Sequence, residues 1–189
     1  MPRTSRIVVL VALLSGGCNM PTLVDGSRPA TIGNLTVSPQ ANWNQISLNT
    51  GHTVWTQNGL TLDSLHFLTN VQDGKPLYPI SGIRTADQLP YRGTMLPNDV
   101  QDLVVSTLQR EGYDNVRAGS LAPCPFLGAT GFCFELDFAT KEGLVMKGKV
   151  TAQKRDTTLD VVQFRAPAEY YFPSLAPTVD KIVASAQPR

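Results

Sequence analysis

The chain has 189 residues, of which 42% are hydrophobic and 16% are charged. This composition supplies enough apolar material for one packed core and too little charge for a disordered chain. The formal net charge is +1, so the sequence lacks the basic excess that holds nucleic acid. With two histidines and three cysteines, few side chains are available to hold a metal ion.

The first 17 residues are typical of a secretory signal peptide. Arg3 and Arg6 precede an apolar run over residues 7–14, and small residues follow the run. This run is too short to cross a bilayer permanently, because a membrane-spanning helix needs about 20 apolar residues.

Residues 14–18, Leu-Ser-Gly-Gly-Cys, resemble the lipobox of bacterial lipoproteins. In that family the signal is cleaved before the cysteine, which then carries acyl chains; the matching residue here is Cys18. The leucine lies four positions before Cys18, where three is usual. Asn19 follows, and by the enterobacterial sorting rule this implies the outer membrane, with the domain facing the periplasm. An ordinary signal peptide with an incidental cysteine is the alternative.

Residues 18–33 are rich in proline and glycine and have little periodicity. They are predicted to form a lipidated N-terminus and a flexible tether. The folded domain is expected to span residues 34–189.

The first half of this domain is predicted to begin with strands over residues 35–38 and 43–48. The Asn58-Gly59 pair then predicts a two-residue hairpin turn between strands over 53–57 and 60–68. In that register His52 faces Leu65 and His66 faces Gly51. The two histidines would therefore lie on opposite faces of the sheet and could not share a metal ion.

A long segment over residues 76–97 contains four prolines and two glycines. Such a loop in a compact domain is either functional or mobile. An amphipathic helix follows over residues 98–111, with Asn98 as its N-cap and Gly112 as its left-handed C-cap.

The second half is predicted to form strands over 116–121, 132–138, 144–153 and 159–164, and a helix over 175–186 with Pro177 in its first turn. A three-residue loop ending at Gly143 would bring apolar pairs and opposite charges into register together. The expected pairs are Phe138–Met146, Phe134–Val150, Asp137–Lys147 and Glu135–Lys149. This order of elements indicates an α+β fold, a mainly antiparallel sheet with helices packed on it.

The C-terminal residues resemble those of PsbP-like domains. The shared pattern is Ala166-Pro167, then Tyr170-Tyr171-Phe172, then a helix with Ile182-Val183-Ala184-Ser185; Trp43 also fits the opening of such domains. The resemblance implies a single-domain α/β/α sandwich. It also implies an accessory or assembly subunit, or a binding module, without catalytic residues, and no functional residue can be transferred from it.

Two groups of residues are candidate sites besides Cys18. Cys124 and Cys133 are expected to form a disulfide in an oxidising envelope, and a redox-active pair is the less favoured reading. Tyr170, Tyr171 and Phe172 form an aromatic cluster, either an interaction surface or core packing under the last helix.

No pattern in the chain matches a catalytic site, a cofactor site or a metal site. Asp63 and Asp73, or Glu135 and Asp137, are the candidates for paired carboxylates. The second pair has lysines opposite it and is expected to be solvated. We therefore expect a membrane-anchored envelope lipoprotein that is not an enzyme and that binds another envelope protein. The alternative is a protein that binds a lipid or cell-wall fragment in a pocket beneath residues 76–97.

Overall fold

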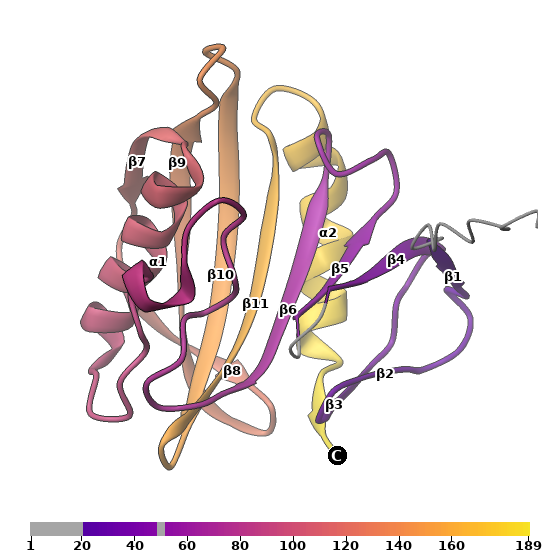
Figure 1. The fold of residues 1–189 in the computed structure, drawn as a ribbon. Coiled ribbons are helices and arrows are strands. Elements are labelled where there is room, and N and C mark those ends of the chain that lie inside the picture. The colour runs from indigo at the N-terminus through magenta and orange to yellow at the C-terminus, as the bar shows by residue number, and fades with distance from the viewer. Residues whose placement is uncertain (1–20, 49–51) are drawn as a thin grey trace, which may run out of the picture.

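The computed structural model describes residues 21–48 and 52–189. The signal peptide, the lipobox and Cys18 lie outside the described residues. Nine strands form one sheet in the order β1-β4-β5-β6-β11-β10-β9-β7, and β8 pairs with β9 (Figure 1). These strands are β1 (Thr22–Val24), β4 (Trp43–Leu48), β5 (His52–Thr56), β6 (Ser64–Val71), β7 (Asp114–Ala118), β8 (Ala122–Phe126), β9 (Ala129–Ala139), β10 (Val145–Arg155) and β11 (Thr158–Pro167).

Two long helices cover opposite faces of this sheet. Helix α1 (Pro97–Glu111) and residues 72–96, which include the 3-10 turn η1 (Thr85–Asp87), cover the face that we name the α1 face (Figure 1). Helix α2 (Tyr171–Ala184) covers the other, the α2 face. The recorded strand pairs of the described residues are antiparallel. The predicted α+β sandwich is therefore confirmed.

Each face of the sheet has its own apolar core, because side chains alternate along every strand. On the α1 face, Leu103 and Leu108 of α1 belong to one buried cluster with Phe134 and Leu136 of β9. On the α2 face, α2 packs with a group that includes Trp43, Trp55 and Phe67. Aromatic rings contact one another in this second core. The Trp55 and Phe67 rings meet edge to face, with their centroids 4.8 Å apart.

The hairpin of β9 and β10 has the predicted register. Phe138 pairs with Met146, Asp137 with Lys147 and Phe134 with Val150. Gly143 has a φ of 86°, in the left-handed region that the turn requires. The Lys149 ammonium, however, pairs with Asp180 of α2 at 2.5 Å rather than with Glu135, which lies opposite it in the ladder.

The predicted tether and the two predicted helices are among the elements that differ from the structure. Residues 22–32, predicted to belong to a flexible tether, form β1 and β2 (Ala30–Ile32), which pair with β4 and β3 (Leu35–Val37). Helix α1 begins at Pro97, one residue early, and the Leu96 N–H donates to Asp99 rather than Asn98 capping the helix. Helix α2 begins at Tyr171, so Pro177 lies inside it and not in its first turn.

A second, small sheet ties the two ends of the described chain together. It has the order β12-β3-β2, and Pro188 of β12 (Gln187–Pro188) pairs with Leu35. No helix of the described residues is long and apolar enough to span a bilayer.

Candidate functional site

The two histidines lie together on the α1 face, which corrects the prediction that they face opposite sides. Strand β5 pairs with β6 so that Val54 faces His66 and His52 faces Leu68. Since residues two apart share a face, His52 and His66 are on the same side. Their ring atoms Nε2 and Nδ1 are 2.9 Å apart, and Nε2 of His66 lies 3.0 Å from the Ser64 hydroxyl.

Burial keeps both imidazoles neutral at neutral pH. Burial and the nearby Arg165 charge lower the pKa of His52 to about 4. The same two causes, with His52 itself, hold the pKa of His66 well below its usual range. One ring donates and the other accepts in the bond between them, because neutral imidazole carries a single N–H.

A buried arginine lies beside the histidines. Arg165 of β11 is 4% exposed, and its guanidinium donates to Glu111 at 2.8 Å, to Gln163 at 2.8 Å and to the Tyr78 hydroxyl at 2.5 Å. The Tyr78 hydroxyl donates in turn to Glu111 at 2.9 Å. Burial raises the pKa of Tyr78 above its usual range, so Tyr78 remains a donor.

This polar cluster connects three layers of the molecule. Arg165 comes from the sheet, Glu111 from the last turn of α1, and Tyr78 from the segment 72–96 that covers the sheet. The guanidinium also lies 5.6 Å from the Tyr78 ring and 5.9 Å from the Tyr113 ring, distances typical of cation–π contacts. Most donors and acceptors of the cluster form hydrogen bonds with one another. These bonds hold α1 and the segment 72–96 on the sheet.

Tyr78, Glu111 and Arg165 were not predicted from the sequence as members of a site. A signal was present, since Gln163 and Arg165 interrupt the otherwise apolar residues 161–167, lie two residues apart and therefore face the same side. Among the described residues, no group of three or more His, Cys, Asp and Glu side chains is placed to hold a metal ion.

The two cysteines lie on paired strands and are free thiols in the structure, so the predicted disulfide is not formed in it. Cys124 of β8 faces Gly131, and Cys133 of β9 faces Ala122, which makes the cysteines diagonal neighbours. Burial and a hydrogen bond with Cys133 raise the pKa of Cys124 to about 12.

The predicted aromatic cluster is divided between core and surface. Phe172 is buried and stacks on Phe164 with ring centroids 5.6 Å apart, Tyr171 is half-buried, and Tyr170 is 68% exposed. Leu144 and Val145 lie at the same end of the molecule and are 46% and 60% exposed. The Ala168 N–H donates to the Val145 carbonyl at 3.0 Å and holds the two segments together. We name Leu144, Val145 and Tyr170 the apolar end.

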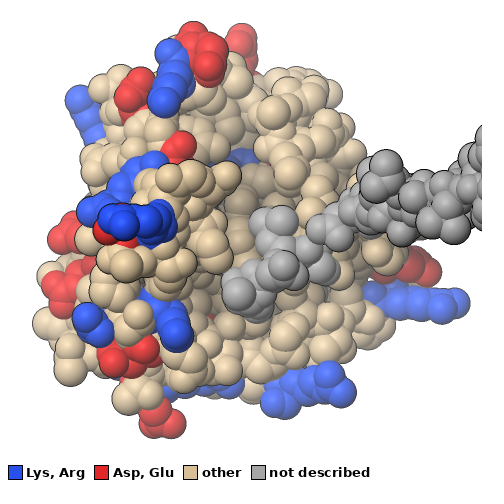
Figure 2. Space-filling model, in the orientation of Figure 1, with Lys and Arg blue, Asp and Glu red and all other residues tan. Residues whose placement is uncertain are grey.

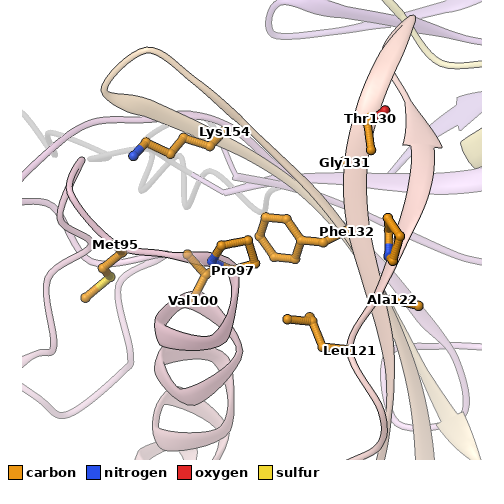
Figure 3. Close-up of a pocket in the computed structure, with 10 residues that line it drawn as sticks. Met95, Pro97, Val100, Leu121, Ala122, Thr130, Gly131, Phe132 and Lys154 are labelled. Atoms are coloured by element: carbon orange, nitrogen blue, oxygen red, sulfur yellow. The ribbon is translucent and has the colours of Figure 1, made fainter.

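The surface of the described residues has several hollows large enough for a small ligand, of which three bear on the predicted sites and on helix α1. One of about 420 Å³ lies between the start of α1 and strands β8 and β9; we name it the α1 pocket (Figure 3). A second of about 340 Å³ is lined by Pro76, Tyr78 and Thr85 in the predicted loop region. A third of about 580 Å³ lies beside α2 and includes Cys124 and Cys133.

Charged side chains of both signs are interspersed on the face seen in Figure 2, mainly on the side of α1. No extended field of one sign covers this face. Such a surface gives little electrostatic steering toward a charged macromolecule.

Comparison with known proteins supports the fold. No family model and no curated protein sequence matches the chain. Among solved structures, cyanobacterial PsbP (CyanoP) from Synechocystis is similar, with a TM-score of 0.55 and 11% identity over 95% of this chain and 99% of that one. The domain therefore has a PsbP-like fold, as the C-terminal residues predicted.

Two further structures are more distant. A protein from Bacteroides thetaiotaomicron has a TM-score of 0.49 and 8% identity over 90% of this chain and 48% of that one. LpqN, described as involved in cell envelope biogenesis of Mycobacterium tuberculosis, has a TM-score of 0.37 and 11% identity over 92% of this chain and 86% of that one.

Proposed function

We propose that this protein is a lipid-anchored accessory protein of the bacterial cell envelope. Its PsbP-like domain binds another envelope protein and catalyses no reaction. Acyl chains on Cys18 hold the domain at the outer membrane, on the periplasmic side. The support for this location is the lipobox-like segment 14–18, and acylation at such a cysteine would anchor a domain because each buried methylene adds about 0.8 kcal/mol.

The observation that carries the binding function is the apolar end. Val145 and Tyr170 leave 60% and 68% of their surfaces in water, although the chain has a well-formed core. Large aromatic and aliphatic side chains that stay exposed together are typical of protein-binding surfaces. The surrounding surface has mixed charge (Figure 2), so apolar contact would supply most of the affinity.

The absence of catalysis in this proposal is supported by the chemistry of the polar cluster. His52 and His66 bond to one another, and Arg165 is neutralised by Glu111. Groups that already satisfy each other inside a core are poorly placed to exchange protons with a substrate.

Site-specific photo-crosslinking tests the binding function. A photoreactive amino acid replaces Tyr170 in the full chain produced in its own host, and the control replaces Leu96, which is 61% exposed next to residues that line a pocket with Lys154, at the other end of β10 from Val145. One discrete crosslinked protein at position 170 that is absent at position 96 is expected. Equal patterns at both positions would contradict the proposal.

Fractionation tests the anchor separately. The wild-type chain is expected in the membrane fraction and the Cys18→Ser variant in the soluble fraction. Mass spectrometry of the wild-type N-terminus should show acylation at Cys18. An unmodified N-terminus, or membrane association that survives the substitution, would contradict the anchor.

A further inference from the structure

The α1 pocket is apolar over most of its wall. Met95 precedes α1, Val100 lies in its first turn, and Leu121 and Phe132 come from the region of β8 and β9. In Figure 3 the Phe132 ring points from β9 toward Pro97 and Val100, and the Leu121 side chain points into the same space. The volume of about 420 Å³ lies within the range of small-ligand sites.

One charged group stands at this pocket. Lys154, near the end of β10, is the only charged residue among the described residues that line it. Figure 3 shows its side chain reaching above Phe132 toward the segment that carries Met95. Lys154 is exposed and forms no ion pair with the described carboxylates.

An apolar hollow with one unpaired cation at its mouth is complementary to an amphiphile with one negative charge. We propose that the α1 pocket binds a single acyl chain that ends in a carboxylate, a fatty acid, with the carboxylate paired to Lys154. The chain lies against Phe132, Leu121 and Val100. The limited volume admits one chain, whereas a two-chain lipid needs a larger hollow.

This site is separate from the apolar end. Val145 and Lys154 lie near opposite ends of β10, and a strand rises by about 3.3 Å per residue, so they are roughly 30 Å apart. The two sites can therefore be tested independently. A lack of protein binding at the apolar end would not contradict the fatty-acid site, and a lack of fatty-acid binding would not contradict the apolar end.

Nuclear magnetic resonance of methionine methyl groups tests the site in an unaltered pocket. The full chain carries Cys18→Ser, so that no acyl chain of its own enters the assay, and is titrated with octanoate, decanoate and dodecanoate below their micelle concentrations. The Met95 methyl signal should shift and saturate, whereas that of Met146, which is 5% exposed in the core, should not. Affinity should rise about fourfold per added methylene and level off once the pocket is filled. No saturable shift of Met95, or equal shifts of both signals, would overturn the proposal.

Variants separate the two parts of the site. Leu121→Trp fills the pocket and should weaken dodecanoate binding about tenfold or more. Lys154→Met keeps the apolar stem and should weaken dodecanoate binding about fivefold, as expected of an exposed ion pair, without changing the affinity for dodecanol. The control Lys181→Met should change neither. Equal loss for the acid and the alcohol in Lys154→Met would overturn the role of Lys154.

A last experiment asks whether the ligand's negative charge is a carboxylate or a phosphate. A lysophosphatidylglycerol with the same acyl chain offers a phosphate in place of the carboxylate. Weaker binding of this lipid than of dodecanoate supports the fatty acid. Tighter binding that depends on Lys154 would overturn the assignment of a carboxylate.

Discussion

The Nε2 atom of His52 lies 2.9 Å from the Nδ1 atom of His66, with both rings buried between the sheet and its covering segment. The rings stack with centroids 5.1 Å apart, and His52 also lies 4.9 Å from the Tyr78 ring. Protonation of either ring would place a positive charge beside Arg165 with no added acceptor. Protonation of the pair should therefore destabilise the fold.

Acid should destabilise the protein through these histidines. The pKa of His52 falls to about 4 in the folded state, below the value of about 6.5 in the unfolded chain. Below pH 6.5 the unfolded state takes up more protons, so stability is complete above that pH and declines as pH falls toward 4. The loss from His52 is on the order of 3 kcal/mol.

Urea unfolding of wild type and of the double variant His52→Gln/His66→Gln at pH 7.5, 6.0 and 5.0 measures this effect. The wild type should lose stability between the first and last pH values, and the variant should lose markedly less. Parallel pH profiles for the two proteins would contradict the assignment.

The ion pair of Arg165 and Glu111 should show strong coupling. Removing Glu111 leaves a buried guanidinium short of an acceptor, whereas removing Arg165 leaves Glu111, whose side chain is 21% exposed, partly able to reach water. We expect Glu111→Ala to cost about 3 kcal/mol and Arg165→Met about 2 kcal/mol, since broken buried pairs are expensive. In a double-mutant cycle the combined variant should be more stable than the sum of the single losses predicts, by about 2 kcal/mol. Additive losses would show that the pair acts through separate contacts.

The strand register was predictable from the sequence where two patterns agreed. For β9 and β10, the apolar pairs, the opposite charges and the position of Gly143 all specify one register, because a shift by one residue would move every side chain to the other face. The C-terminal helix and the overall fold class were also predictable from apolar periodicity. The start of α2 was not, since Pro177 was predicted to lie in the first turn of a helix over 175–186, whereas the helix begins at Tyr171 and Pro173 lies in its first turn.

The β5–β6 hairpin shows why the histidine pair could not be predicted. The Asn58-Gly59 pair indicated a two-residue turn, but residues 57–63 form a longer loop around a buried carboxylate. Asp63 is 1% exposed and accepts the N–H groups of Gln57 and Asn58, each at 2.7 Å. His52 consequently pairs with Leu68 and not with Leu65. A shift of three residues exchanges the faces of one strand relative to the other.

Asp63 should therefore be important for stability. Asp63→Ala removes an ionised acceptor from two N–H groups, and hydrogen bonds to charged groups contribute about 1.5–3 kcal/mol. We expect a loss of about 3 kcal/mol in urea unfolding. The matched control Asp114→Ala, at an exposed position of β7, should change stability by less than about 0.5 kcal/mol. Similar losses for both substitutions would contradict the role of Asp63.

The cysteines offer a chemical test of the β8–β9 hairpin. Because the pKa of Cys124 is raised to about 12 by burial and by its neighbour Cys133, little thiolate exists at pH 8, and the thiolate is the reactive form. In the reduced protein, alkylation of Cys124 by iodoacetamide should be on the order of 1000-fold slower than in urea, where the pKa returns to about 8.5 and the thiolate fraction rises by that factor.

Peptide mass spectrometry at timed intervals measures the rate at each cysteine. Rates within threefold of each other in native and unfolded protein would contradict the shifted pKa. The same method applied to protein taken from an oxidising compartment tests the predicted disulfide, since a bond between Cys124 and Cys133 would leave no thiol to alkylate until a reductant is added. Because diagonal neighbours on paired strands are about 7–8 Å apart, farther than an unstrained disulfide spans, this bond would require β8 to shift relative to β9.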